Sequence, residues 1–311
     1  MRAVRIEDNQ ARVVDVPAPD GPDDDHVVVD VATSSICGTD LGFVTLGFGG
    51  FTLGHEFAGL VDGVPHAVEP LMPCGSCGQC AAGHRQRCVG DHANLGIFVD
   101  GGLADQARVR RSALVPLPPG LDVSDACLVE PTAVAWHGAV RAETQPGQRV
   151  VVVGGGSIGL LAVAALRHLG AEVDLESRHP HQRHAGERLG AGSPSGSYDI
   201  VIDAAGSESG LARGAELATP GARIVLLGVY HGLLPAPGAV TLVKELSWVG
   251  AMAYGDHHGR REVDEAAELL ARDPEIADTV ITHRFGLDEA AEAFRTAADR
   301  AAGAIKVVLQ P

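Results

Sequence analysis

Four consecutive valines, Val150–Val153, run directly into the sequence Gly-Gly-Gly-Ser-Ile-Gly at positions 154–159, and an apolar stretch follows. This order predicts a buried strand, a tight glycine turn and the start of a helix, the context in which a G-x-G-x-x-G match indicates a dinucleotide site. Gly154 permits the turn, Gly156 lets the backbone approach a pyrophosphate, and Gly159 lets the helix pack on the strand. The expected cofactor-binding residues of this turn are Gly154, Gly156, Ser157, Ile158 and Gly159.

Strand and helix patterns continue to alternate along the middle of the chain. Between about residues 121 and 254, apolar strands are expected near 150–153, 173, 200–203 and 223–227, with helices that reach residues 168 and 189. Such alternation predicts an α/β fold with a doubly wound parallel sheet of the Rossmann type.

The two ends of the chain have different patterns. Short alternating strands, such as 26–32 and 107–111, predict a β-rich domain before about residue 119. Two helical patterns, at 262–271 and 288–298, precede a final strand at 305–309, and this tail is expected to return to the first domain. We therefore divide the chain into a β-rich domain at 1–121, a cofactor domain at 122–254 and a returning segment at 255–311.

The choice between NAD and NADP is expected to depend on a residue about 20 positions after the glycine turn, where an acidic side chain would bond the adenosine ribose. Counting along residues 172–179 places the end of the next strand at Ser177, followed by Arg178. A serine does not repel a 2′-phosphate, and Arg178, with Arg183 as a second candidate, can bind one through charge-assisted hydrogen bonds. Ser177 and Arg178 therefore favour NADP. A shift of one residue would place Glu176 at the strand end and favour NAD.

Four of the six cysteines lie within fifteen residues, in the order C-x-x-C-x-x-C-x7-C. In an intracellular chain, such spacing is more typical of metal binding than of disulfides. Four thiolates close a tetrahedral shell around zinc and leave no open position, so the pattern predicts a structural zinc site. Its ligands would be Cys74, Cys77, Cys80 and Cys88.

A second set of metal-binding residue types is spread along the chain. Cys37 begins a Cys-Gly-Thr-Asp sequence, His55 and Glu56 lie within a Gly-His-Glu sequence, and Glu130 precedes a proline. Each piece alone is weak, because a single cysteine or histidine usually has a packing role. Together they supply the sulfur, nitrogen and oxygen ligands of an open, catalytic zinc.

The order of these motifs resembles the zinc-containing medium-chain dehydrogenases, and within them the branch of sorbitol, threonine and glucose dehydrogenases. The similarity rests on Cys-Gly-Thr-Asp, Gly-His-Glu-Phe-Ala-Gly, the four-cysteine segment, Glu-Pro-Thr-Ala and Gly-Gly-Gly-Ser-Ile-Gly, and it covers nearly the whole chain. It implies a GroES-like catalytic domain beside the Rossmann domain and two zinc ions per chain. It also implies hydride transfer between NAD(P) and an alcohol or polyol, or the matching aldehyde or ketone.

The resemblance implies roles for individual residues as well. Thr39 would begin the proton relay, and Asp40 would bond the far nitrogen of the zinc-binding histidine and fix its tautomer. The ligands of the catalytic zinc would be Cys37, His55 and Glu56, with Glu130 as a fourth, exchangeable or water-linked ligand.

The sequence also departs from the family pattern. The segment before Cys74 lacks the usual loop with Gly-Asp-Arg-Val, and Gly42 stands where many relatives carry a relay histidine. We expect these changes to affect the substrate pocket and the proton exit path rather than the zinc ligands. Cys127 is interpreted as a buried packing residue, with a thiolate ligand in place of Glu130 as the alternative.

Charge and composition narrow the partners. The chain carries 24 Lys and Arg against 40 Asp and Glu, a formal net charge of −16, which repels nucleic acids and anionic membrane surfaces. No apolar run approaches the roughly 18 to 20 residues of a membrane span, and the N-terminus is polar, so a cytoplasmic location is expected. A small-molecule substrate follows, and the family likeness implies a homodimer or homotetramer.

Two other functions compete with a zinc-dependent dehydrogenase. A zinc-free enoyl or quinone reductase of the same superfamily would not need metal-binding residues. The four-cysteine segment and the set of Cys37, His55 and Glu56 therefore argue against it. A non-catalytic binding or structural protein would keep the fold without needing intact ligand residues. The motifs therefore favour the zinc enzyme.

Overall fold

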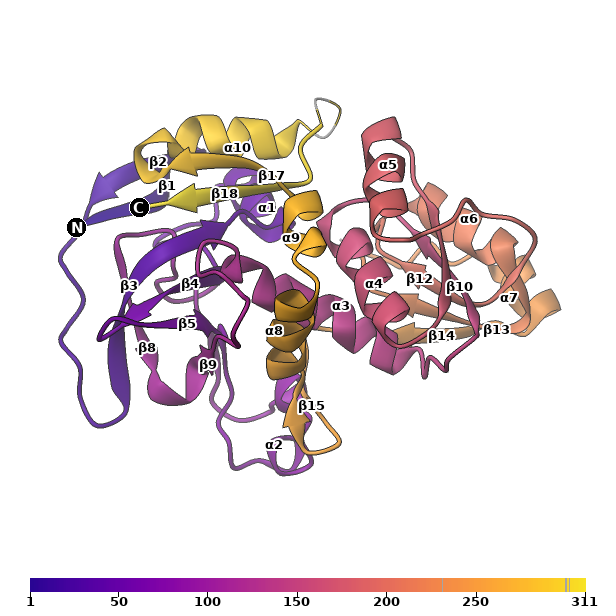
Figure 1. The fold of residues 1–311 in the computed structure, drawn as a ribbon, viewed down its shortest axis with the longest axis horizontal. Coiled ribbons are helices and arrows are strands. Elements are labelled where there is room, and N and C mark those ends of the chain that lie inside the picture. The colour runs from indigo at the N-terminus through magenta and orange to yellow at the C-terminus, as the bar shows by residue number, and fades with distance from the viewer. Residues whose placement is uncertain (231, 300, 302) are drawn as a thin grey trace. The chain divides into compact units, whose positions relative to one another are not determined.

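The computed structural model describes residues 1–230, 232–299, 301 and 303–311. These residues divide into two compact units, one formed by Met1–Glu130 with Gly255–Pro311 and the other by Pro131–Tyr254. The first boundary lies later than residue 121, where the sequence placed it, and the division by function stays a prediction. In the first unit the C-terminal strands lie beside the N-terminal ones (Figure 1).

The first unit is built on a seven-stranded sheet in the order β17-β18-β3-β4-β5-β9, with β8 also paired to β3. Its strands are β3 (His26–Ser35), β4 (Glu56–Val61), β5 (Val64–Val68), β8 (Gln106–Arg110), β9 (Leu114–Pro116), β17 (Ile281–Gly286) and β18 (Lys306–Gln310). Because side chains alternate along a strand, Val27, Val29 and Val31 of β3 point together into the core beside Phe57. The β-rich character of this unit agrees with the sequence pattern.

Smaller elements complete the first unit. Three short antiparallel pairs are β1 (Arg2–Glu7) with β2 (Gln10–Asp15), β6 (Leu71–Met72) with β7 (Ala93–Asn94), and β15 (Asp256–His257) with β16 (Arg260–Arg261). The helices are α1 (Gly38–Leu46), α2 (Gly78–Ala81), α8 (Glu262–Arg272), α9 (Glu275–Val280) and α10 (Ala290–Ala298), with 3-10 turns η1 (Arg85–Arg87), η2 (Arg111–Ala113), η3 (Ala126–Leu128) and η4 (Leu287–Glu289). Phe294 of α10 packs with Val4, Leu53 and Leu309 in a second core.

The second unit contains a five-stranded parallel sheet, as predicted. Its order is β11 (Glu172–Glu176), β10 (Arg149–Val153), β12 (Tyr198–Asp203), β13 (Ala218–Leu226) and β14 (Ser247–Gly250). The helices are α3 (Val129–Arg141), which begins at the end of the first unit, α4 (Ser157–His168), α5 (Pro180–Arg188), α6 (Glu208–Leu217) and α7 (Gly238–Lys244). The valines of β10 are buried on both faces, as strands covered by helices require.

The position of β10 makes its end a natural binding place. This strand lies between β11 and β12, so the strand order reverses there, and ligands of such sheets bind outside the carboxyl ends of the strands at this point. The glycine turn follows β10 at that end. β11 is the edge strand of this sheet. Among the described residues, its outer side carries a single β-bridge between Asp174 and Gly192, at the position where a six-stranded Rossmann sheet has a further strand.

None of the helices in the described part of the chain is long and apolar enough to cross a membrane.

Candidate active site and metal centres

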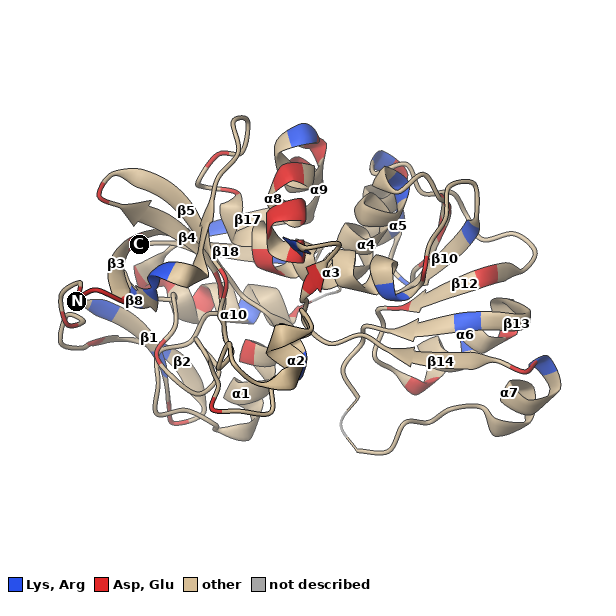
Figure 2. Ribbon diagram, turned by 90° about the horizontal axis from the view of Figure 1, so that it is seen from below, with Lys and Arg blue, Asp and Glu red and all other residues tan. Residues whose placement is uncertain are grey.

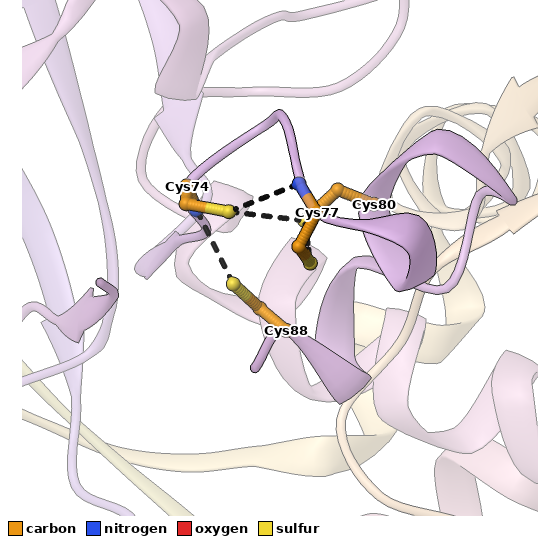
Figure 3. A group of neighbouring side chains, drawn as sticks. All are labelled: Cys74, Cys77, Cys80 and Cys88. Carbon is orange, nitrogen blue, oxygen red and sulfur yellow. Dashed lines mark hydrogen bonds between the residues drawn. The ribbon is translucent and has the colours of Figure 1, made fainter. Parts of the chain in front are cut away.

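The four cysteines that are close in sequence also converge in space (Figure 3). Their sulfur atoms all lie within 4.8 Å of one another. The Cys80 Sγ lies 3.5 Å from the Cys77 Sγ and 4.0 Å from the Cys74 Sγ. Four sulfurs placed tetrahedrally at about 2.3 Å from zinc would stand about 3.8 Å apart, so the group has the dimensions of a zinc-sulfur shell.

Backbone groups hold these sulfurs in place. The Cys77 N–H donates to the Cys74 Sγ at 3.4 Å, and the Cys74 N–H donates to the Cys88 Sγ at 3.3 Å. Backbone hydrogen bonds from Cys80 and Val89 lower the pKa of Cys77 to about 5, whereas burial raises the pKa of Cys80 to about 12, so Cys77 ionises more readily than Cys80.

Cys37, His55 and Glu56 form a second group, with one ligand atom from each within 4.8 Å of the others. Cys37 is the N-cap of α1, and Glu56 begins β4 opposite Ser35 of β3. The antiparallel pairing therefore brings the cysteine after β3 close to the histidine and glutamate at the start of β4. His55 and Glu56 are buried, and Cys37 is partly buried.

Asp40 lies beside this group in a different way from the one predicted. It is completely buried and accepts a hydrogen bond from the Cys37 N–H at 2.8 Å. Its Oδ1 lies 3.7 Å from the His55 Nδ1, which is too long for a hydrogen bond. Neither atom has another hydrogen-bond partner in the described part of the chain. Burial opposes a charge on His55, but Cys37 and Asp40 outweigh it and raise the pKa of His55 well above its ordinary value.

The Glu56 carboxylate also contacts two residues outside the ligand group, Lys306 and Ser35. The Lys306 Nζ lies 2.7 Å and 3.0 Å from its two oxygens, and the Ser35 hydroxyl donates to one of them. The side chains of Glu56 and Lys306 are only 1% and 2% exposed. Sheet register explains the meeting, because Ser35 lies opposite Glu56 on one side and Val308 of β18 on the other. If Glu56 binds a metal ion, its carboxylate would do so while it remains paired with the Lys306 ammonium group.

Glu130 and Cys127 differ in their relation to this group. Glu130, in the first turn of α3, is buried but lies outside the three residues whose ligand atoms converge. Burial raises its pKa to about 8, and His55 opposes the rise, so the two groups interact electrostatically. Cys127 is completely buried, and burial raises the pKa of its thiol to about 11. These properties agree with a packing role for Cys127.

The remaining predicted residues of the first unit lie on or near α1. The Thr39 Oγ1 is 3.7 Å from the Cys37 Sγ. A Cβ added at Gly42 would meet no atom within 4 Å, so the absence of a side chain there leaves open space. The missing loop before Cys74 is replaced by a tight turn at Asp62 and Gly63, both at positive φ, which joins β4 directly to β5.

The glycine turn has the backbone that its sequence predicts. Gly154 has a φ of +112°, and a Cβ on Gly159 would lie 1.8 Å from the Gly154 carbonyl oxygen. Gly156 is the N-cap of α4, and a Cβ there would meet no atom within 4 Å. Ser157 and Ile158 form the first turn of the helix. Two of the glycines are therefore required by close packing, whereas Gly156 leaves free space at the helix N-terminus.

The end of β11 corrects one sequence prediction. The strand ends at Glu176, one residue before the predicted Ser177. However, the Glu176 carboxylate accepts a hydrogen bond from the Arg213 Nε of α6 at 3.2 Å. A Cβ on Gly155 would lie 2.8 Å from the Ser177 Cβ, so the serine borders the glycine turn. Because successive side chains alternate, the glutamate points to α6 instead, and Arg178 is exposed beside the serine.

Comparisons with known proteins agree with this architecture. Residues 23–119 match the family described as the alcohol dehydrogenase GroES-like domain. A protein named probable D-xylulose reductase A, from Arthroderma otae, is 31% identical over 83% of this chain and 85% of its own length. The chain belongs to the medium-chain alcohol dehydrogenase family.

Other matches of this dehydrogenase extend over both units. Galactitol 1-phosphate 5-dehydrogenase of Escherichia coli (strain K12) is 28% identical over 98% of both chains. The crystal structure of galactitol-1-phosphate dehydrogenase from Escherichia coli covers 100% of each chain with a TM-score of 0.89 and 28% identity. A structure from Sinorhizobium meliloti 1021, bound to NADP, is 30% identical with a TM-score of 0.86 and covers 100% of this chain and 99% of its own.

Sequence reasoning missed three residues of the dehydrogenase's sites. Lys306 and Ser35 hold Glu56, and Gly90 is required in the cysteine lobe because a Cβ there would lie 2.6 Å from the Cys74 Sγ. One signal was available, because Lys306 is one of only two lysines in the chain and interrupts an apolar strand pattern.

Two glycine variants separate the packing role of the turn from its binding role. Gly156→Ala is expected to leave the free energy of unfolding within about 1 kcal/mol of wild type, because the methyl group enters open space at an ordinary φ of −75°. It should weaken dinucleotide binding by about tenfold or more, because that space is where the backbone approaches a pyrophosphate. Gly159→Ala, by contrast, should lower the free energy of unfolding by about 1 to 3 kcal/mol through overpacking. Urea unfolding and dinucleotide titration measure both effects, and unchanged binding by Gly156→Ala would argue against a cofactor site at this turn.

Proposed function

We propose that this chain is a zinc-dependent dehydrogenase that interconverts a polyol or secondary alcohol with its ketone, using NADP as the preferred cofactor. The observation that carries the proposal is the convergence of Cys37, His55 and Glu56, residues from two separate segments, into one buried group of sulfur, nitrogen and oxygen donors. The names of the relatives, which include galactitol, xylulose and sorbitol enzymes, support the polyol class.

The residues present suit zinc at both groups. Four thiols without a further ligand position suit a structural ion, held by Cys74, Cys77, Cys80 and Cys88. In the second group, three donors leave room for substrate, and Glu130 stands nearby as an exchangeable fourth ligand. The unpartnered His55 Nδ1 and Asp40 Oδ1 are 3.7 Å apart, and a small shift would join them and leave the other ring nitrogen free to bind a metal.

Zinc, when bound, supplies a Lewis acid for the alcohol oxygen, and the nicotinamide supplies the hydride acceptor. The chain's own residues do the rest. Thr39, whose hydroxyl lies 3.7 Å from the Cys37 Sγ, would accept the proton that the substrate hydroxyl releases while it passes its own hydroxyl proton onward. Asp40 would orient the imidazole of His55 once the two atoms close their 3.7 Å gap, and Lys306 limits the negative charge that Glu56 brings to the buried site. Because Gly42 carries no side chain, the proton would pass from Thr39 to water in the open space there.

The cofactor preference rests on the residues that border the glycine turn. Ser177 presents a hydroxyl there, and no carboxylate takes its place, because Glu176 pairs with Arg213. Arg178 and Arg183 supply positive charge beside the serine. The neighbour solved with NADP is consistent with this preference.

A panel of polyols, secondary alcohols and ketones, assayed with NADP and NAD in parallel, tests the proposal. We expect turnover of at least one polyol or secondary alcohol with kcat/KM higher for NADP. Ser177→Asp should reverse the preference, because a carboxylate repels a 2′-phosphate and bonds a ribose hydroxyl. A clear preference of the wild type for NAD would contradict the assignment of Ser177 and Arg178, and failure of the whole panel would contradict the substrate class.

We also propose that the chain works as a homodimer or homotetramer. β14 is at the edge of its sheet, and the neighbouring segment exposes Leu242, Val243 and Met252, which are 80%, 84% and 74% exposed. A free strand edge beside apolar side chains is a natural pairing surface for a second copy. Light scattering should give at least twice the chain mass of 32.1 kDa, and a monomer at micromolar concentration would contradict this.

A further inference from the structure

The cysteine lobe, residues 71–94, has no core of its own. None of its residues, all of which the structure describes, is buried. The two-residue strands β6 and β7 close its base, and between them lie only the short helix α2, the 3-10 turn η1 and irregular turns. A segment that buries no side chain gains little from the hydrophobic effect. Its order must therefore come from the metal and from contacts with the rest of the first unit.

Glu69, which follows β5 and precedes the lobe, holds one arginine of the lobe. Its side chain is only 1% exposed, and the Arg85 Nη2 lies 3.0 Å from each of its two oxygens. Arg85 begins η1, the turn between Cys80 and Cys88. A charge-assisted contact of this kind is stronger and more directional than a neutral hydrogen bond. The pair therefore ties the part of the lobe between two of its cysteines to the sheet.

A second arginine reaches the same carboxylate from the segment that follows residue 254. The Arg261 Nη1 lies 3.5 Å from the Glu69 Oε2, while its Nη2 and Nε donate to the Asp264 carboxylate at 2.7 Å and 3.0 Å. Arg261 is the N-cap of α8, whose acidic positions are red in Figure 2. Burial raises the pKa of Glu69, and both arginines oppose the rise, so each favours the ionised carboxylate.

The backbone of the lobe also contacts the residues just before Arg261. The Asp256 N–H donates to the Gly83 carbonyl oxygen at 2.9 Å, and β15 lies beside the lobe that carries α2 (Figure 1). A Cβ on Gly255 would lie 2.5 Å from the Gln86 Oε1 and 2.9 Å from the Gly83 carbonyl oxygen, so the two segments touch without room for a side chain. The lobe and residues 255–261 therefore form one packed group around Glu69.

We propose that Glu69 is a positioning residue of the structural zinc site. Through Arg85 it holds the cysteine lobe in its metal-binding conformation, and through Arg261 it couples zinc retention in the lobe to the order of residues 255–261. The inference rests on the structural zinc ion of the proposed function. Such a coupling is reciprocal, so zinc in the lobe also stabilises residues 255–261, where the chain re-enters the first unit.

Zinc release from the full-length Cys37→Ala protein into an excess of a colorimetric chelator tests the coupling, because this variant is expected to hold only the zinc ion of the lobe. Adding Glu69→Gln should speed release about tenfold or more, the usual cost of losing a residue that orients metal ligands. Hydrogen exchange should rise together in residues 73–92 and 255–261 and stay unchanged in α4. Removal of zinc from Cys37→Ala should likewise raise exchange in residues 255–261.

Variants of the two arginines keep the test decisive even if Glu69→Gln does not fold. In the same Cys37→Ala background, Arg85→Met should speed zinc release as much as Glu69→Gln, and the two together should be no faster than either alone, because they break one pair. Arg261→Met, which leaves the pair of Glu69 with Arg85, should have a smaller effect, and Arg261→Lys should restore most of the retention.

Asp105→Asn is the matched control, because Asp105 pairs with Arg2 at 2.8 Å in the same unit but outside the lobe. It should leave zinc release within about twofold of the Cys37→Ala protein, since distant sites act independently. An equal acceleration by Asp105→Asn, or no acceleration by Glu69→Gln and Arg85→Met, would overturn the coupling and leave the zinc site in place. A Cys37→Ala protein without zinc would contradict the structural zinc site itself, and the coupling with it.

Discussion

Lys306→Met is expected to lower the free energy of unfolding of the zinc-loaded protein by about 3 to 5 kcal/mol, measured by urea denaturation. The reason is the buried pair that Lys306 forms with Glu56, whose side chains are 2% and 1% exposed. Methionine has nearly the same length but no charge, so the buried carboxylate of Glu56 loses its cation and keeps only the Ser35 hydroxyl and the proposed zinc ion as partners. Removing one partner of a buried pair costs far more than the pair contributes on balance.

Lys244→Met is the matched control, because Lys244 is the other lysine of the chain. Its Nζ donates to three backbone carbonyl oxygens at the end of α6 and pairs with no carboxylate among the described residues. This variant should lose about 1 to 2 kcal/mol, through weakened capping of the helix. The double variant Glu56→Gln with Lys306→Met should recover part of the loss. Equal losses for the two lysine variants would contradict the account of the buried pair.

Cys37→Ala is expected to remove one of two zinc ions and to lower kcat/KM by about a thousandfold or more. In the proposed site three protein donors would hold the catalytic ion, and loss of the thiolate would leave His55 and Glu56, of which Glu56 is already paired with Lys306. A Lewis acid contributes several kcal/mol to such reactions, and about 1.4 kcal/mol corresponds to tenfold in rate. Metal analysis and steady-state kinetics on the same preparation check both effects.

Cys127→Ala serves as the control for this experiment. Cys127 is a buried cysteine outside the ligand group, with its Sγ 3.9 Å from the Asp125 carbonyl oxygen. It should keep both zinc ions and stay within about threefold of the wild-type kcat/KM, with a modest loss of stability from the small cavity. Loss of a zinc ion in this variant would show that Cys127, rather than Glu130, is the alternative fourth ligand.

Local patterns predicted much of the fold and the metal groups. The alternation of strands and helices gave the parallel sheet, because each burial pattern is complete within a few residues. The four cysteines lie within fifteen residues, so short turns alone can bring their sulfurs together. The glycine turn is equally local, since Gly154 and Gly159 approach each other across a single turn.

What the sequence could not predict depends on pairing between distant segments. Lys306 meets Glu56 only because β18 and β4 lie on either side of β3, across 250 positions of sequence. The 3.7 Å gap between Asp40 and His55 likewise follows from packing that no motif encodes. At the end of β11, counting residues placed the strand end one position late, and only the packing shows that Ser177 borders the glycine turn while Glu176 pairs with Arg213.

The most direct measurement is the zinc content of the purified wild-type protein, determined by mass spectrometry and related to chain concentration. The geometry of the two donor groups predicts two zinc ions per chain, one of which is lost in Cys37→Ala while the other remains. A protein that turns over alcohols with NADP while holding no zinc would contradict the account.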